Sequence, residues 1–140
     1  MELFKESRPF LKGNLHCHTT MSDGLKTPEE AIEIYRGMGY DFLAVTDHRG
    51  VSVAESRMEG DMLVLPGIEL DYTLPSEAVH IVGFGMTSNI LPQLNYELGA
   101  QAGIDAIRAC DGRAIIAHPH WSLNTLSTLM ALRDLSAAEV

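Results

Sequence analysis

The chain has 140 residues, enough for one domain or half a barrel but too few for a complete (β/α)-barrel of about 250 residues. Hydrophobic residues make up 46% and charged residues 21%, a composition that forms a core and excludes a disordered chain. The net charge of −9 argues against broad electrostatic capture of nucleic acid or of an anionic membrane. A phosphate substrate stays open, because a bound metal can invert the local field.

Nothing in the sequence indicates a membrane or secreted protein. No run approaches the ~20 apolar residues of a membrane span, and residues 1–6 lack the basic start and apolar middle of a signal peptide. The 2 cysteines, Cys17 and Cys110, are too few for a disulfide framework. We therefore expect a reduced, cytoplasmic protein without a membrane partner.

The clearest helix signal begins at Thr27. Thr27 is a suitable N-cap, Pro28 suits the first helical position, and Glu30 completes a capping box. The predicted helix continues to Met38, with Gly39 as its stop.

Apolar runs predict strands before and after this helix. They cover residues 11–18, 41–46, 62–69, 78–84 and 113–117, and residues 136–140 have the pattern of the start of one more strand. Pro66 and Gly67 suggest a bulge or bend in the third strand. Residues 90–110 predict a long helix, and residues 125–132 predict another. This alternation indicates the α/β class.

The third and fourth strands should form a hairpin-like pair. Residues 70–79, including Pro75, are the whole connection between Glu69 and His80. A βαβ crossover with its helix needs at least about 10–12 residues. A hairpin-like excursion is therefore favoured, and it would place Glu69 near His80.

Histidines beside predicted strand ends are the main chemical signal. The 6 histidines are His16, His18, His48, His80, His118 and His120. His16 and His18 are two residues apart in a strand, so their side chains share one face and Cys17 points to the other as a packing residue. One such histidine alone would more often be a hydrogen-bonded core or surface residue. Several of them with Glu69, at strand ends that converge, predict a metal site.

The chemistry of this set favours a catalytic site. Neutral imidazole and carboxylate suit zinc, manganese or iron. Because the set contains no thiolate, it is typical of a catalytic centre with open coordination positions rather than a closed structural zinc site.

Three further polar residues have two interpretations each. Asp23 is either a turn residue before Gly24 or a metal ligand. Asp47 either orients a histidine or serves as a turn or cap residue. Arg49 either meets a phosphate oxygen or is a solvated surface arginine.

The segment around Pro119 is the least determined. Pro119 should hold His118 extended, which leaves the direction of His120 open. We expect His120 to contact a metal ligand or to face substrate rather than to bind metal directly. Trp121 either lines a pocket or packs.

These residues give the sequence a resemblance to the PHP (polymerase and histidinol phosphatase) family. The resemblance runs from Gly13 to Ser122. Its motifs, in order, are His16-Cys17-His18 with Ser22-Asp23-Gly24, Thr46-Asp47-His48, Gly67-Ile68-Glu69 with Val79-His80-Ile81-Val82-Gly83, and Ala117-His118-Pro119. The resemblance implies a distorted seven-stranded (β/α) barrel. It also implies two or three divalent metals and phosphoester hydrolysis by metal-activated water, with no protein nucleophile.

The resemblance also implies three metal positions. The implied ligands are His16 and His18 for the first, His80 and His118 for the second, and Asp23 and His48 for the third. Glu69 would bridge the first two metals.

One family motif is missing. The family closes its site with a C-terminal Asp-x-His, which supplies ligands to the first and third metals. No histidine follows His120 here, and the later acids Asp134 and Glu139 lie outside such a motif. We therefore expect residues 1–140 to be a single, C-terminally truncated PHP domain that lacks the last barrel strands. Its open edge would favour self-association.

The predicted function is hydrolysis of a phosphomonoester or a small phosphodiester, with a small phosphorylated substrate as partner. The alternatives are an amidohydrolase-type metal hydrolase, whose first strand also ends in His-x-His, and a non-catalytic metal-binding or structural domain. The second motif and the early Glu69 favour the PHP family. Lys5, Lys12 and Lys26 are all N-terminal, which argues against a carbamylated lysine bridge. A nuclease stays open despite the net charge.

Overall fold

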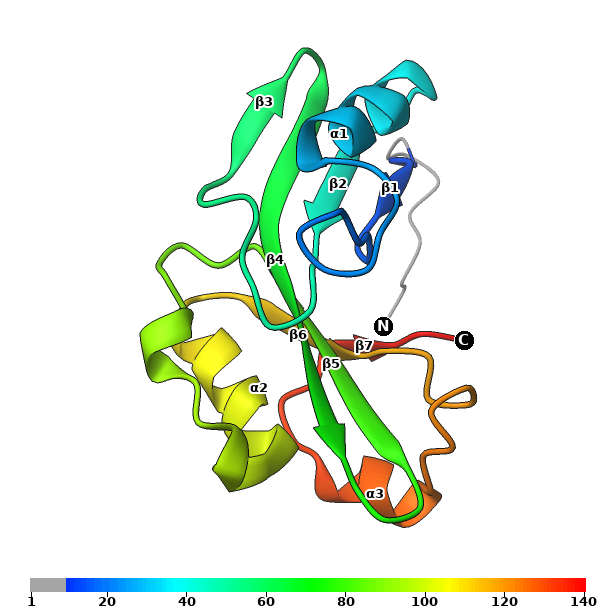
Figure 1. The fold of residues 1–140 in the computed structure, drawn as a ribbon, viewed down its shortest axis with the longest axis vertical. Helices are drawn as coiled ribbons and strands as arrows, with labels where there is room; N and C mark the ends of the chain where they lie inside the picture. Colours follow the sequence, from blue (N-terminus) through cyan, green and yellow to red (C-terminus); the bar gives the residue numbers. More distant parts are fainter. Residues whose placement is uncertain (1–9) are drawn as a thin grey trace.

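A curled mixed sheet organises the chain in the computed structural model, which describes residues 10–140 (Figure 1). Its strands lie in the order β1 (Gly13–Asn14), β2 (Phe42–Val45), β4 (Met62–Thr73), β5 (Ala78–Phe84), β6 (Arg113–Ile116) and β7 (Ala137–Ala138). The short β3 (Arg57–Glu59) pairs with β4 as an unpredicted antiparallel partner. The mixed α/β class is confirmed. The absence of a signal peptide was predicted from residues 1–6, which lie outside the described residues.

Strand directions explain which strand ends meet. β1, β2 and the first part of β4 are parallel, β5 is antiparallel to both β4 and β6, and β6 is parallel to β7. Because β5 runs against its neighbours, its beginning lies beside the end of β6. The predicted hairpin between the third and fourth strands is confirmed.

β4 is longer than predicted and changes partner along its length. Its first part pairs with β2 as far as Pro66, and its second part pairs with β5 from Gly67 to Thr73. The prediction that the strand stops at Glu69 is wrong, because pairing with β5 continues through Asp71, which lies opposite His80.

Helix α1 (Pro28–Gly37) confirms its sequence signal. The Thr27 side chain accepts a hydrogen bond from the Glu30 backbone N–H, and the Glu30 side chain accepts one from the Thr27 backbone. Met38 caps the C-terminus, and Gly39 follows with a φ of +71° that favours glycine. The predicted helix near residue 125 is also present, as α3 (Leu126–Ala131) with Thr125 as its N-cap.

The single helix predicted over residues 90–110 is wrong. The segment contains η1 (Leu91–Gln93), η2 (Tyr96–Leu98) and α2 (Gly99–Ala109). Pro92 lacks an N–H, the Asn95 side chain accepts a hydrogen bond from the Glu97 N–H, and Gly99 has a φ of +79°. These features interrupt the helical pattern before Gly99.

The first predicted strand, residues 11–18, is also too long. Only β1 is regular, because beyond Asn14 the chain bonds to Thr46, just after β2, through one side-chain and one backbone hydrogen bond. The Cys17 backbone N–H donates to Thr46 Oγ1, and the Thr46 N–H donates to the Cys17 carbonyl.

The two larger of three hydrophobic clusters among the described residues stabilise the two halves of the molecule. One joins α1 to β2 and the first part of β4, around Ile32, Leu43 and Val64. The other joins α2 to β5, β6 and the second part of β4, around Ile81 and Ile107. β4 therefore belongs to both. Among residues 10–140, no helix is long and apolar enough to span a membrane.

Candidate metal centre

Glu69 lies on β4 at the middle of the candidate site. Along this strand Ile68, Leu70 and Tyr72 pack into the hydrophobic cluster that contains Ile81 and Ile107. Because side chains alternate along a strand, Glu69 and Asp71 face the opposite side of the sheet. The Glu69 side chain is 0% exposed. A buried carboxylate requires partners, and here they are histidines.

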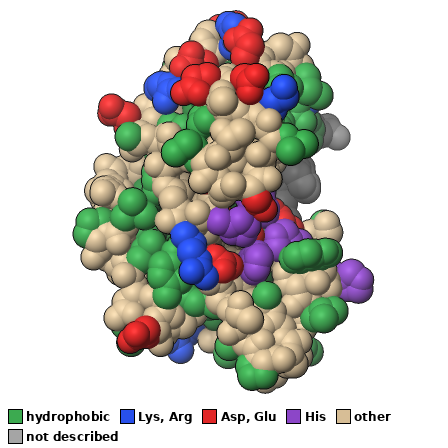
Figure 2. All heavy atoms as spheres, viewed as in Figure 1, with side chains coloured by type: hydrophobic (Ala, Val, Ile, Leu, Met, Phe, Trp, Pro, Cys, Tyr) green, Lys and Arg blue, Asp and Glu red, His purple; other side chains and the backbone are tan. Residues whose placement is uncertain are grey.

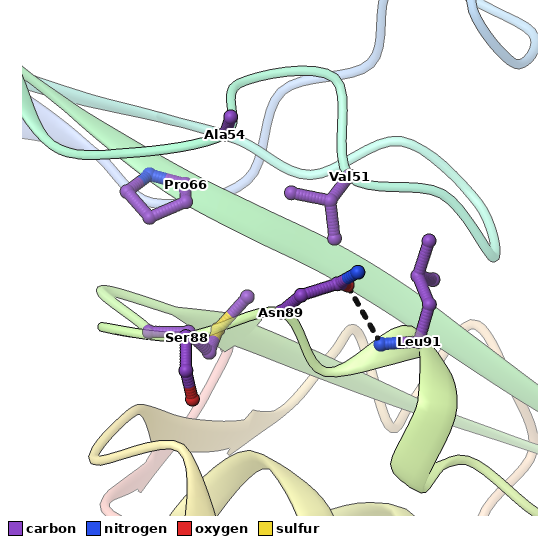
Figure 3. A pocket seen from close by; sticks show the side chains of 7 residues that line it. Val51, Ala54, Pro66, Ser88, Asn89 and Leu91 are labelled. Carbon is purple, nitrogen blue, oxygen red and sulfur yellow. Dashed lines mark hydrogen bonds between the residues drawn. The ribbon is translucent and has the colours of Figure 1, made fainter.

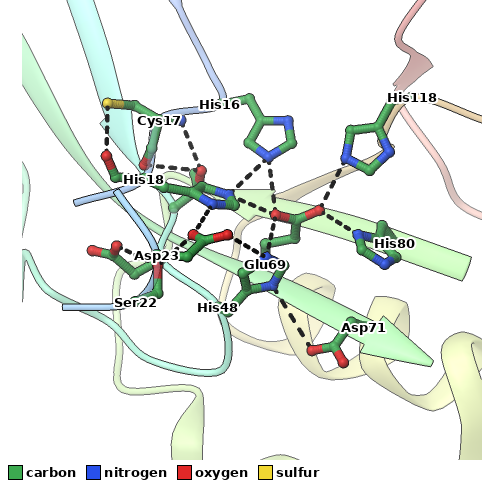
Figure 4. Close-up of polar contacts among 12 residues, drawn as sticks. His16, Cys17, His18, Ser22, Asp23, His48, Glu69, Asp71, His80 and His118 are labelled. Carbon is green, nitrogen blue, oxygen red and sulfur yellow. Dashed lines mark hydrogen bonds and ion pairs between the residues drawn. The ribbon is translucent and has the colours of Figure 1, made fainter. Parts of the chain in front are cut away.

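His80 and His118 contact one oxygen of Glu69 (Figure 4). His80 lies opposite Asp71 and therefore diagonal to Glu69, with Nδ1 2.8 Å from Glu69 Oε1. The Ala117 N–H donates to the His80 carbonyl, which places the next residue, His118, beside His80. His118 Nε2 lies 3.3 Å from the same Oε1.

Three other histidines surround the second oxygen. His16 Nε2 lies 3.0 Å, His18 Nε2 2.6 Å and His48 Nε2 3.6 Å from Glu69 Oε2. Cys17 packs against the hydrophobic cluster around Ile32, Leu43 and Val64, as the strand alternation predicted. The carbonyl of Asp47 and the N–H of Arg49 both bond to the Glu69 backbone, which fixes His48 between them.

Asp23 lies at the edge of this histidine cluster. Its Oδ1 is 2.6 Å from His18 Nδ1, and its Oδ2 is 3.8 Å from His48 Nε2. Asp23 lies in a turn, as one interpretation predicted, and its carboxylate also contacts His18 and His48; its role as a metal ligand stays a prediction.

Among residues 10–140 the Asp47 carboxylate has no histidine as hydrogen-bond partner, so the interpretation that this carboxylate orients a histidine is wrong. Its buried carboxylate accepts hydrogen bonds from the Thr19 N–H and hydroxyl at 2.6 and 2.7 Å, from the Ser22 hydroxyl at 2.7 Å, and from the Ser52 hydroxyl. Asp47 thus holds the loop that carries Asp23.

Glu139 is a site residue that the sequence analysis missed. Its Oε1 lies 2.9 Å from His16 Nδ1, and its Oε2 accepts the His118 backbone N–H at 2.9 Å. Its position after a strand is the feature that could have indicated it. Glu139 directly follows β7 (Ala137–Ala138), and His118 likewise lies just beyond the end of β6.

The other candidate residues lie around the cluster. Arg49 donates to both oxygens of Asp71 at 2.8 and 2.6 Å, and its guanidinium lies over the Tyr96 ring. His120 is exposed and outside the residues that line the cleft, whereas Trp121 lines it. The prediction that Pro119 holds His118 extended is wrong, because His118 has a φ of +27°.

Hydrogen bonds between these groups shift their pKa values. Burial alone would raise the pKa of the Glu69 carboxyl, but hydrogen bonds from His16, His18 and His80 lower it below its ordinary value. The hydrogen bond to Glu69 is the main reason that the pKa of His18 rises to about 9, aided by Asp23 and opposed by burial. A proton on His18 would therefore compete with a cation for the ring nitrogens of that residue.

The cluster opens into a cleft of about 480 Å³, lined by His18, Asp23, His48, Glu69, His80, His118 and Trp121. On the face shown in Figure 2, the histidines gather in the middle of the molecule. A basic side chain lies on one side of them and hydrophobic side chains lie on the other.

A second cavity, of about 210 Å³, is mostly apolar (Figure 3). It is lined by Val51, Ala54, Pro66, Met86, Ser88, Asn89 and Leu91. Since none of these side chains is titratable near neutral pH, the cavity offers no acid–base or metal chemistry.

Several groups of ligand atoms in the cluster lie within 4.8 Å of one another. They are His16–His18–Glu69, Glu69–His80–His118, His18–Asp23–His48 and His16–His118–Glu139. His16 Nε2 and His18 Nε2 face each other at 3.0 Å beside Glu69 Oε2. Converging imidazole and carboxylate atoms of this kind fit a divalent cation.

Comparisons with known proteins point to hydrolases. The chain is 30% identical over 104 residues to a 5′-3′ exoribonuclease of Haemophilus influenzae, covering 71% of the chain and 38% of that protein. It is 35% identical over 79 residues to the 5′-3′ exoribonuclease Rnm of Salmonella typhimurium, covering 52% and 27%. It is also 26% identical over 122 residues to the DNA polymerase/3′-5′ exonuclease PolX of Bacillus subtilis, covering 86% and 21%. The chain thus spans well under half the length of these curated relatives.

Solved structures resemble the fold. One is a protein of Bifidobacterium adolescentis provisionally assigned as a metal-dependent phosphoesterase, with a TM-score of 0.71, 15% identity, and coverage of 94% of this chain and 77% of that one. Another is an amidohydrolase of Chromobacterium violaceum with bound sulfate and no metal, with a TM-score of 0.61, 16% identity, and coverage of 91% and 76%. At these identities the likeness shows the fold alone. No protein-family model matches the sequence.

The nuclease relatives weaken one expectation drawn from composition. The net charge of −9 gave little support to nucleic acid as a partner. Net charge governs long-range attraction to a polymer, whereas one phosphoester at a local cationic site depends on that site's own field. A nucleic-acid substrate is therefore compatible with this chain.

Proposed function

We propose that this chain is a PHP-type phosphoesterase domain that depends on divalent zinc, manganese or iron. The observation that carries the proposal is the division of contacts at Glu69. Its Oε1 faces His80 and His118, while its Oε2 faces His16, His18 and His48. A carboxylate divided in this way is suited to bridge two cations.

The proposed ligand positions follow that division. His80 and His118 hold one cation, His16 and His18 hold another, and Asp23 with His48 offers a third position. When bound, the cations supply a water nucleophile active near neutral pH and positive charge for the phosphoryl oxygens. The residues of this chain orient the imidazoles and keep the bridging carboxylate ionised.

The residues around the ligands set their orientation. Ser122 Oγ lies 2.9 Å from His118 Nδ1, and Glu139 lies at the same distance from His16 Nδ1. Such partners fix which ring nitrogen points into the site. Within residues 10–140, the cleft has no lysine in its lining, so the carbamylated lysine bridge of an amidohydrolase-type site has no support there.

Elemental analysis of the untagged chain, purified without added metal, tests the proposal. We expect close to two or more zinc, manganese or iron ions per chain and hydrolysis of a generic aryl phosphomonoester or phosphodiester. Glu69→Gln should lose both metal and activity, while Asp61→Asn, in the exposed turn before β4, should keep both. A metal-loaded wild-type chain without phosphoesterase activity would favour the non-catalytic alternative. A chain without tightly bound metal, and without activity on metal addition, would overturn the proposal.

A further inference from the structure

Trp121 combines high exposure with a place in the cleft. It is 73% exposed, yet it lines the same cleft as Glu69. Its ring centroid lies 5.2 Å from that of His118 and 6.3 Å from that of His80, with the ring planes nearly perpendicular. A large aromatic ring that is exposed to water at the rim of a polar cleft is available to contact a ligand.

The turn that carries Trp121 is firmly held on both sides. The Ser122 N–H donates to the His118 carbonyl at 3.0 Å, and the Ser122 carbonyl accepts the Ala78 N–H at 3.1 Å. The Asn124 side chain donates to the Ala78 carbonyl at 2.7 Å. The ring is therefore presented from an ordered backbone, which lowers the entropy cost of a contact with ligand.

We infer that Trp121 stacks on the base of a nucleotide whose phosphoester lies at the Glu69 cluster. This inference rests on the proposed function. In a nucleotide, one ribose separates the phosphoester from a flat aromatic base, and Trp121 is the aromatic group next to His118 and His80. Every base has a π-face, so stacking on an aromatic side chain tolerates any sequence.

The other residues of the cleft favour a base over a sugar as the group on Trp121. Recognition of a sugar needs several fixed polar partners for its hydroxyls. Apart from Trp121, the lining residues are the histidines and carboxylates of the proposed metal positions. The nearby Arg49 is already engaged by Asp71.

The net charge of the chain indicates that it contacts few phosphates of its substrate. With a net charge of −9, few phosphates beyond the one at the cluster can be neutralised. The shared chemistry is a base next to one phosphoester, which either a mononucleotide or the end of a single-stranded oligonucleotide supplies.

Trp121 is the 1 tryptophan of the chain, so its fluorescence reports directly on the inferred contact. The zinc-loaded chain is titrated with inorganic phosphate and with the methylenephosphonate analogues of AMP and of ribose 5-phosphate. We expect the AMP analogue to quench the fluorescence and to bind about tenfold more tightly than the ribose analogue. A short phosphorothioate oligoadenylate added in a further arm distinguishes an oligonucleotide end from a mononucleotide as the preferred source.

Variants test the contact by calorimetry, without the fluorescent probe. Trp121→Ala should bring the affinity ratio of the AMP and ribose analogues close to one, and Trp121→Phe should restore part of it. Leu126→Ala removes a similarly exposed side chain of α3, 71% exposed and outside the cleft, and should keep the wild-type ratio.

The outcomes separate the two proposals. Equal affinities for the two analogues in the wild type, or an unchanged ratio in Trp121→Ala, would overturn the stacking inference and leave the phosphoesterase proposal standing. If neither analogue nor phosphate binds to the zinc-loaded chain, both proposals fail.

Discussion

Glu139 Oε1 lies 2.9 Å from His16 Nδ1, although 123 positions separate the two residues. The contact joins the residue after β7 to the second residue beyond the end of β1. The second oxygen of Glu139 accepts the His118 N–H, so one carboxylate connects two of the proposed metal positions.

Glu139→Gln should therefore weaken metal binding. The amide retains the size of the carboxylate but loses its charge, so the orientation and basicity of His16 change. Losses of about 10–100-fold in metal affinity are typical for partners of this kind. Competition with a chelator measures the change. Asp134→Asn, an exposed acid in the same C-terminal segment, is the control and should retain wild-type affinity. If both variants retain it, Glu139 does not support the site.

Glu69→Ala should remove more metal than Asp23→Ala. Glu69 contacts five imidazoles and is fully buried, whereas Asp23 is two-thirds exposed and lies near His18 and His48 alone. Elemental analysis of both variants should show loss of most metal from the first and of at most one ion from the second. Equal metal contents would contradict the bridging role of Glu69.

Asp47→Asn should destabilise the fold without removing a metal ligand. The buried carboxylate accepts hydrogen bonds from Thr19, Ser22 and Ser52, and loss of such a charged acceptor costs about 1–3 kcal/mol in the free energy of unfolding. Burial opposes ionisation, but these hydrogen bonds lower the pKa of Asp47 below its ordinary value.

The sign of the pH dependence follows from that lowered pKa. The carboxylate of Asp47 stabilises the folded state fully above the ordinary pKa of about 4 and progressively less as the pH falls through the folded-state pKa. Urea unfolding should therefore show a larger difference between wild type and Asp47→Asn at pH 7 than at about pH 3. Asp61→Asn, in an exposed turn, should match wild type at both pH values. A constant difference would contradict the lowered pKa.

Two glycine substitutions should differ in their effect on the free energy of unfolding. A Cβ at Gly103 in α2 would overlap the Tyr72 hydroxyl and lie 2.8 Å from Leu70 Cδ1, so Gly103→Ala should cost about 1–3 kcal/mol. A Cβ at Gly37 in α1 meets nothing within 4 Å, so Gly37→Ala should be neutral or stabilise by up to about 1 kcal/mol. Thermal unfolding of the two variants measures both. A stabilised Gly103→Ala would show that α2 packs less closely on β4.

The parts of the site that were predictable depend on local rules. The position of Glu69 beside His80 follows from the length of the connection between them, because ten residues are too few for a crossover helix. The common face of His16 and His18 follows from strand alternation alone, even though regular pairing ends at Asn14.

The parts that were left open or missed depend on contacts distant in the sequence. The position of Asp23 is set by the hydrogen bonds of Asp47 to its loop, which no local pattern reveals. Glu139 reaches the site because β7 pairs with β6, and a strand of two residues leaves almost no hydrophobic pattern. The prediction of one helix over residues 90–110 was wrong because Pro92 and Gly99 interrupt the helix despite the apolar residues around them.

The change of partner along β4 has a consequence for how the molecule unfolds. His16, His18 and His48 belong to the half built on α1 and β2, whereas His80, His118 and Glu139 belong to the half built on α2, β5 and β6. Glu69 lies on β4, a strand that both halves share. A cation held from both sides would therefore act as a crosslink between two hydrophobic cores. Partial opening of either half would release the cation. Its binding would therefore stabilise both halves together and make their unfolding more cooperative.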